Sequence, residues 1–203
     1  MEGDCMSKEG KNGVTANTPK NILFGAGTIH KGLKFTTNTW NFMESLVGAT
    51  NGGSKLSIVP EVYEVPIDGA MVSTKGLTVK TGETATMEVN FAELTADIIK
   101  AATIGKTETS DVTTHEMIVS KASIEEGDYW ENIAFVGKTL KGENIIAILP
   151  NAICTSGFEQ EGKNKEGAVG KYTFKCHAEL NSDLDTLPWK IYYPKATTAT
   201  TTT

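Results

Sequence analysis

The sequence predicts a mainly β protein: an antiparallel β-sandwich or rolled barrel with one flanking α-helix. Several segments alternate polar and apolar residues with a period of two, as half-buried strands do. Glycine is abundant, with 20 glycines in 203 residues, and this composition suits strands and turns. Only one segment combines helix caps with an apolar stripe. A chain of this length fits one domain with a substantial core.

The first expected hairpin joins Gly76–Lys80 to Thr84–Phe91 through a turn at Thr81-Gly82-Glu83. Alternate apolar residues of the two segments point the same way across this glycine-containing turn. We therefore expect two short strands that pair with each other, connected by a tight turn.

The expected helix covers about residues 91–104. Asn90 is a favourable N-cap, Glu93 stands three residues later as in a capping box, and Gly105 would end the helix in a left-handed conformation. Polar residues alternate with the apolar stripe, so one side should pack on the sheets and the other should face solvent. The residues expected on the core face are Leu94, Ile98 and Ala101.

A second hairpin is expected from Asn132–Leu140 and Asn144–Leu149, joined by Lys141-Gly142-Glu143. Its second strand is too uniformly apolar to have one wet face, which predicts that this strand is covered on both sides. Single strands are expected elsewhere, and the second of the three has the clearest alternation: Met117–Ile124, Val169–Ala178 and Trp189–Tyr193.

Two long stretches, Thr36–Pro66 and Gly105–His115, lack a clear strand pattern. Loops of this length in compact domains usually serve a function or a partner. Residues 1–19 are polar and aperiodic, so we expect a flexible N-terminal arm ahead of a β-sandwich domain at residues 20–194. Residues 195–203 are expected to form a flexible, threonine-rich C-terminal tail.

The charge pattern disfavours a sequence-specific nucleic-acid reader. All 19 basic residues are lysine, whereas arginine supplies the planar fork that dominates phosphate and guanine recognition. The formal net charge of −6 should repel a polyanion over most of the surface. Cys5, Cys154 and Cys176 lack metal-site spacing, and the last two lie in apolar runs that predict burial. We expect a reducing cytoplasm, no signal peptide and no membrane contact.

No pattern indicates catalysis. His30, His115 and His177 lie far apart, in turn-like or outward-facing strand positions without metal-ligand spacing. The glycine-rich segment Phe24–Thr28 lacks the lysine and the helix of a phosphate-binding loop. The acidic residues within Glu125–Asp128 are expected in a surface turn. We therefore expect no enzyme activity, no cofactor and no metal.

Eight segments stand in a characteristic order along the chain: Asn21–Ile29, Leu46–Gly53, Val62–Ala70, Lys75–Leu77, Met87–Ile104, Asn132–Gly137, Asn151–Gly157 and Pro188–Pro194. In this order and spacing, over roughly residues 21–194, the chain resembles the major tail (tail tube) proteins of tailed bacteriophages that infect Gram-positive bacteria. The resemblance implies hexameric rings that stack into a hollow tube, through which DNA is ejected. One sheet of each subunit would line the lumen.

The resemblance also implies partners and a location. The partners would be other copies of the chain, a tape-measure protein and DNA in the lumen, and a tail terminator and a baseplate or distal tail protein at the ends. The protein would be located in the tail of the virion, and in the host cytoplasm during assembly. Two alternatives remain open: the inner tube of a contractile tail or phage-derived bacteriocin, and a monomeric β-sandwich binding module.

In such tubes a long loop and the terminal arms clamp neighbouring subunits. Here this implies an inter-subunit loop within Thr36–Pro66, with these contact residues: Leu46, Gly48, Asn51, Gly53, Leu56, Ile58 and Val59. An acidic lumen would keep DNA from adhering to the wall. The acids expected to face it are Glu83 and Glu88.

Overall fold

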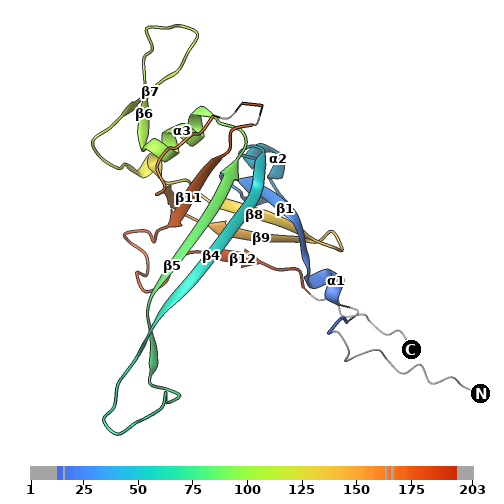
Figure 1. Cartoon of the computed structure of the whole chain (residues 1–203), viewed down its shortest axis with the longest axis vertical. Coiled ribbons are helices and arrows are strands. Elements are labelled where there is room, and N and C mark those ends of the chain that lie inside the picture. The colour runs from blue at the N-terminus through green and yellow to red at the C-terminus, as the bar shows by residue number, and fades with distance from the viewer. Residues whose placement is uncertain (1–12, 16, 163, 166, 196–203) are drawn as a thin grey trace, which may run out of the picture.

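The computed structural model describes residues 13–15, 17–162, 164–165 and 167–195, and it is mainly β, as the sequence predicts (Figure 1). Two four-stranded antiparallel sheets form the sandwich. The strands of the first sheet, in spatial order, are β1 (Leu23–His30), β8 (Ile133–Thr139), β9 (Asn144–Leu149) and β12 (Lys190–Tyr192). Those of the second sheet are β10 (Ala152–Cys154), β11 (Gly170–Cys176), β5 (Thr78–Phe91) and β4 (Thr50–Glu64).

Shorter elements complete the fold: α1 (Thr18–Asn21), β2 (Phe35–Thr36), β3 (Thr39–Trp40), α2 (Phe42–Ser45), α3 (Ala96–Thr103), β6 (Gly105–Glu108), β7 (Met117–Ser120) and the 3-10 turn Glu126–Asp128. The strands β2 and β3 pair with each other, as do β6 and β7. The expected N-terminal arm lies outside the described residues at positions 1–12 and 16, and α1 begins within it. Residues 196–203 of the expected tail also lie outside them.

The main core lies between the two sheets. On β11, Tyr172, Phe174 and Cys176 are buried while Lys171 and Lys175 are exposed, which confirms the alternation expected for this strand. Cys154 is buried as well, as predicted. Burial raises the pKa of the Cys176 thiol to about 11, so this side chain acts as a small apolar group rather than a nucleophile.

A second, smaller core covers the outer face of the first sheet. The hairpin expected from Asn132–Leu140 and Asn144–Leu149 is confirmed as β8 and β9. The side chains of Leu33, Trp40 and Phe42 pack over it, and Trp40 also meets Tyr192 of β12 with ring centroids 5.1 Å apart. The prediction that the second strand of this hairpin is covered on both sides is confirmed, because Leu149 lies in the main core while Ile146 and Ile148 lie in the second core.

The expected hairpin with a turn at Thr81-Gly82-Glu83 is wrong. These residues lie inside the single strand β5, which pairs along its length with β4. Opposite Glu61 and Val62 the register passes from Gly82 to Lys80, so Thr81 is the extra residue of a β-bulge. A bulge and a tight turn can share the same local glycine signal, and only the partner strand decides between them. That partner strand lies entirely within the stretch Thr36–Pro66, which the sequence did not predict to be a strand.

The start of the helix also differs from the prediction. Helix α3 begins at Ala96, and the hydroxyl of Thr95 accepts a hydrogen bond from the Ile98 N–H at 3.3 Å. Asn90 remains in β5, where its side-chain amide donates to the Gly52 and Gly53 carbonyls, each at 3.2 Å. Asn90 therefore fixes the irregular start of β4 instead of capping a helix.

The buried face and the C-terminal end of α3 also differ from the prediction. Ile98 and Ala101 are buried, whereas Leu94 precedes the helix and is 46% exposed, so its assignment to the core face is wrong. The left-handed stop is Ile104, with φ of 50°, and not Gly105. A glycine at position 105 avoids a steric clash, since a Cβ there would lie 3.0 Å from the Val119 carbonyl oxygen.

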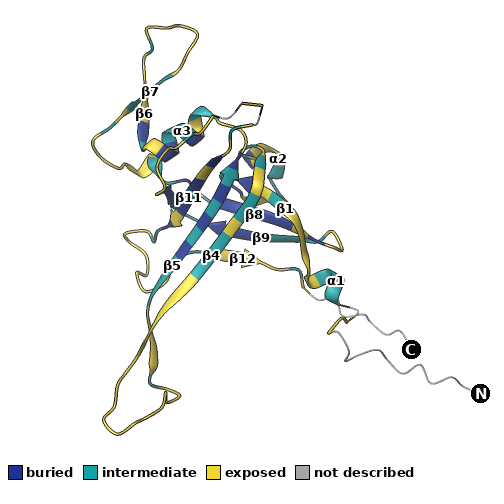
Figure 2. Ribbon diagram, viewed as in Figure 1, coloured by how far each residue is buried: buried dark blue, intermediate teal, exposed yellow. Residues whose placement is uncertain are grey.

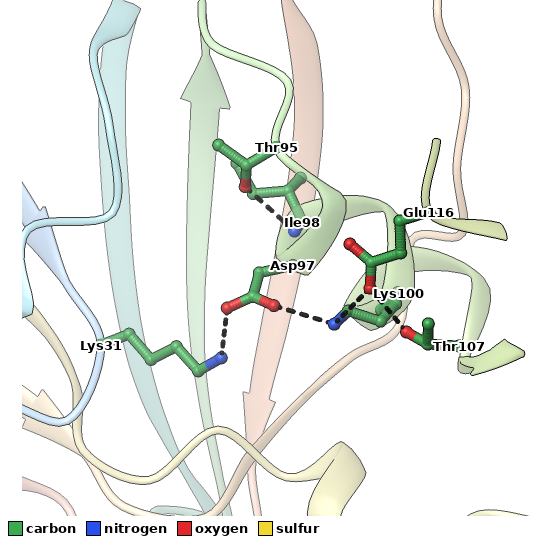
Figure 3. Close-up of polar contacts among 7 residues, drawn as sticks. All are labelled: Lys31, Thr95, Asp97, Ile98, Lys100, Thr107 and Glu116. Atoms are coloured by element: carbon green, nitrogen blue, oxygen red, sulfur yellow. Dashed lines mark hydrogen bonds and ion pairs between the residues drawn. The ribbon is translucent and has the colours of Figure 1, made fainter. Parts of the chain in front are cut away.

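A chain of charged side chains fixes α3 between β1 and the β6–β7 hairpin (Figure 3). The Asp97 carboxylate accepts hydrogen bonds from Lys31 and Lys100, each at 3.1 Å. Lys100 also lies 3.6 Å from Glu116, which accepts a hydrogen bond from Thr107 at 2.8 Å. The pKa of Asp97 is lowered, most by the hydrogen bond from Lys31 and next by the hydrogen bond from Lys100. Because the Asp97 side chain is 56% exposed, solvent weakens these pairs and they chiefly orient the helix.

Candidate functional site

The β4–β5 hairpin continues well beyond the sandwich (Figure 1). We call residues 59–79 the arm: they comprise the distal ends of both strands and the loop 65–77 between them. The Val65 N–H donates to the Leu77 carbonyl at 2.9 Å and closes the base of this loop. Near the sandwich β5 buries every second residue, whereas the arm is exposed on both sides (Figure 2).

The arm carries exposed apolar side chains on both of its faces. Along β4, Val59 and Tyr63 share one face and Val62 lies on the other, because successive side chains of a strand alternate. Their exposed fractions are 52%, 52% and 64%, respectively. In the loop, Met71 is 99% exposed and Val72 is 79% exposed. Apolar surface on both sides of an unsupported hairpin is typical of a segment that is buried only in an assembly.

Each sheet also ends in a strand that can pair further. β4 and β10 lie at the two ends of the second sheet, and β1 and β12 at those of the first. With 15 residues, β4 is long for an edge strand, and natural monomers usually keep their edges short or blocked. A long, partly apolar edge therefore indicates pairing with another chain.

The two acids expected to face a lumen do not share a surface. Glu83 lies on the same face of β5 as Ala85, toward the core, and its side chain is 8% exposed and 2.9 Å from Lys80. The hydrogen bond from Lys80 lowers the pKa of Glu83. Glu88 lies on the outer face, so the assignment of both residues to one wall is wrong.

The outer face of the second sheet is polar and open to solvent. Glu88 lies 2.8 Å from Lys171 and 3.6 Å from Lys55, on the strands to either side of β5. The hydrogen bond from Lys171 lowers the pKa of Glu88. Around this triad the face presents hydroxyl groups from β5 and β11, including Thr86 and Thr173. This face is therefore polar, and its central carboxylate is paired with lysines on both neighbouring strands.

The residues expected in the inter-subunit loop fall into three groups. Leu56 and Ile58 are partly buried and pack against the main core. The other two apolar residues, Leu46 and Val59, are 48% and 52% exposed. The remaining positions lie at or near the start of β4: Gly48, Asn51 and Gly53. Of the seven predicted residues, Leu46, Asn51 and Val59 are exposed, and the exposed surface continues beyond Val59 through residues 60–79.

A hollow of about 800 Å³, here called the acidic pocket, lies between the 3-10 turn and the loop after β11. Its walls carry three carboxylates, from Glu126, Glu131 and Glu179. Leu180 and Leu184 line the same hollow and are 86% and 68% exposed. No local sequence pattern indicates this pocket, because the segments that form it are about fifty residues apart.

His30 is buried, contrary to the expectation of a turn or an outward-facing position. It is 3% exposed, and its Nδ1 lies 2.9 Å from the Ser45 hydroxyl while its Nε2 lies 2.8 Å from that of Thr28. Burial lowers the pKa of His30, with a smaller opposing effect from the backbone of Phe42. Ser45 is also buried, so this serine–histidine pair has no access to a substrate and joins α2 to β1.

Within the described part of the chain, no group of three or more His, Cys, Asp or Glu side chains is placed to hold a metal ion. The other two histidines lie apart: His115 lies beside Thr114, and His177 meets Tyr129 at the rim of the acidic pocket. Among the same residues, no helix has the length and hydrophobicity needed to cross a membrane.

Comparisons with known proteins give little further guidance. No protein-family model matches the sequence, and a search of curated proteins finds no match. Among solved structures the chain is similar to one described as "Virion of native gene transfer agent (GTA) particle", with 13% identity and a TM-score of 0.39. The alignment covers 81% of this chain and 95% of that chain. Similarity at this level does not carry an argument about function.

Proposed function

We propose that this protein is a structural subunit that assembles with copies of itself into the tail tube of a phage-like particle. The observation that carries the proposal is the arm, a hairpin with exposed apolar side chains on both faces. The long edge strand β4 adds hydrogen-bonding groups for pairing. A monomer would leave both features exposed to solvent, whereas an assembly would bury both.

The proposed assembly is a stack of hexameric rings around a channel for DNA. The two sheets differ in their ability to line such a channel. The outer face of the first sheet is covered by the second core, whereas that of the second sheet is polar and open. We assign the lumen to the second sheet. Its wall would be rich in hydroxyl groups, with Glu88 between Lys55 and Lys171 in place of the strongly acidic wall expected from the sequence.

A wall of this kind suits a conduit. The overall charge of −6 on each copy opposes condensation of the protein on DNA. Glu88 offsets one of the two positive charges of Lys55 and Lys171, so this part of the wall keeps a single net positive charge. The proposed partners are a tape-measure protein and DNA in the lumen, and a terminator and a baseplate or distal tail protein at the tube ends. The proposed location is the virion tail, after assembly in the host cytoplasm.

Removal of the arm tests this function. Glu61 pairs with Gly82, so residues 62–81 can be replaced by Asn-Gly, which makes a two-residue hairpin turn at this register. We expect this variant to melt as the intact chain does but to form no tubes, as judged by a sizing column and negative-stain microscopy. Tubes should form only from the intact chain.

A point variant with a matched control refines the same test. Val72→Lys places a charge on the arm, and Val112→Lys places one on another exposed valine, in the β6–β7 loop. The first change should block tube formation and the second should not. An intact chain that remains a 21.8 kDa monomer at every concentration, or an arm-deleted chain that still forms tubes, would overturn the proposal.

A further inference from the structure

The two ends of the β8–β9 hairpin have opposite chemical character. At its open end, Glu131 precedes β8 and Asn151 follows β9, and both line the acidic pocket. At its closed end, the chain turns through residues 140–143. Because β8 has seven residues and a strand rises by about 3.3 Å per residue, the two ends are roughly 20 Å apart. One copy cannot bring its own ends together.

Two of the three carboxylates in the acidic pocket lack an ion-pair partner among the described residues. Glu131 forms an ion pair with Lys34 at 3.3 Å, but no ion pair between described residues includes Glu126 or Glu179. The Glu179 carboxylate accepts a hydrogen bond from the Asn151 side-chain amide, at 2.9 Å. With its two exposed leucines, the pocket therefore suits an occupant that is both basic and apolar.

The closed end of the hairpin has those properties. Leu140 is 50% exposed, and Lys138 and Lys141 on either side of it are also exposed. Strand β1 adds Leu23 and Phe24, which pair with Thr139 and Lys138 and are 45% and 70% exposed. We call this surface the turn patch: Leu23, Phe24, Lys138, Leu140 and Lys141. No ion pair between described residues includes either of its lysines.

We infer that the turn patch of one copy seats in the acidic pocket of the next copy. The two surfaces match in charge and in apolar content, and they lie at opposite ends of one hairpin. Contacts of this head-to-tail kind generate a ring when the rotation between copies closes. In Figure 1 the β8–β9 hairpin lies across the long axis of the molecule, while the arm runs along it. The pocket contact therefore joins neighbours side by side within a ring, and the arm is left to reach the next ring.

This inference rests on the proposed function, since it names the surfaces through which the subunits meet. Charge reversal tests it directly. One variant carries Glu126→Lys with Glu179→Lys, and the other carries Lys138→Glu with Lys141→Glu. All four side chains are on the surface, so both variants should fold, which circular dichroism and melting would verify. Each variant alone would meet like charges at every contact and should fail to form rings or tubes.

Mixing the two variants gives the decisive measurement. When they alternate around a ring, every contact joins either the original pair of charges or the reversed pair, so the mixture should assemble again. A control with Lys106→Glu and Lys165→Glu, two exposed lysines outside both surfaces, should assemble as the intact chain does. The inference is overturned if each reversed variant assembles unaided, if the mixture does not recover, or if the control fails equally. Failure of the intact chain to assemble would instead reject the proposed function.

Discussion

At the scale of single residues, His30 shows how burial changes the meaning of a side chain. An isolated histidine in a sequence is most easily read as a solvated group. Here the ring lies between two hydroxyl groups and 5.6 Å from the ring centroid of Phe42, so it connects β1 to the cover of the second core. Its stability contribution depends on the imidazole being neutral, since burial disfavours the charged form.

This predicts a pH dependence of stability. The folded pKa of His30 lies below the unfolded value near 6.5, so the unfolded state binds the proton first. The contribution is present above that value and is lost as the pH falls through it toward the folded pKa, with a slope of at most about 1.4 kcal/mol per pH unit. Melting temperatures from pH 8 to about pH 5 should fall less steeply for His30→Gln than for the intact chain. His115→Gln, changed at an exposed site, should keep the original profile. Equal slopes in all three proteins would contradict the assignment.

At the scale of elements, α3 shows how a shift in its start changes which residues reach the core. The sequence pattern of the helix is genuine, but two cap signals compete for its first turn. Asn90 is retained by β5 because its amide bridges the carbonyls of Gly52 and Gly53, and Thr95 takes the cap position. The helix starts about one turn later than expected, so the chain before it places Leu94 at the surface.

A pair of substitutions on α3 measures this difference. Ile98→Ala should lower the free energy of unfolding by about 2–4 kcal/mol, because it leaves a cavity at a residue that is 1% exposed. Leu94→Ala should change it by less than about 0.5 kcal/mol, as expected at a half-exposed site. Denaturant titration of the two variants would check both values. Similar losses would mean that Leu94 contributes to the core after all.

At the scale of the whole molecule, the features proposed for assembly point in different directions. The arm extends along the long axis, and the acidic pocket and turn patch lie at the ends of a hairpin across it (Figure 1). The arm offers mainly apolar surface, whereas the pocket contact is largely electrostatic. Contacts within a ring and between rings should therefore respond differently to solution conditions.

Salt should separate the two kinds of contact. Raising the ionic strength from about 0.1 M to about 1 M shortens the Debye length from about 10 Å to about 3 Å, which weakens exposed charge pairs but not apolar burial. Assembly of the intact chain should need a higher protein concentration at high salt. The variant that carries both sets of reversed charges should show the same dependence. Sedimentation of assembled material across a salt series would measure it, and a salt-independent threshold would argue against an electrostatic contact.

The sequence by itself determined the class of fold, the β8–β9 hairpin and its double cover, the alternation of β11 and the existence of one flanking helix. These properties depend on neighbours close in the chain, so periodicity reveals them. Tertiary structure alone decided that Thr81 forms a bulge, that Glu83 faces inward, that Thr95 caps α3 and that the arm and the acidic pocket exist. Each of these depends on pairing between residues distant in sequence, and a local pattern cannot specify which distant strand or loop will supply the partner.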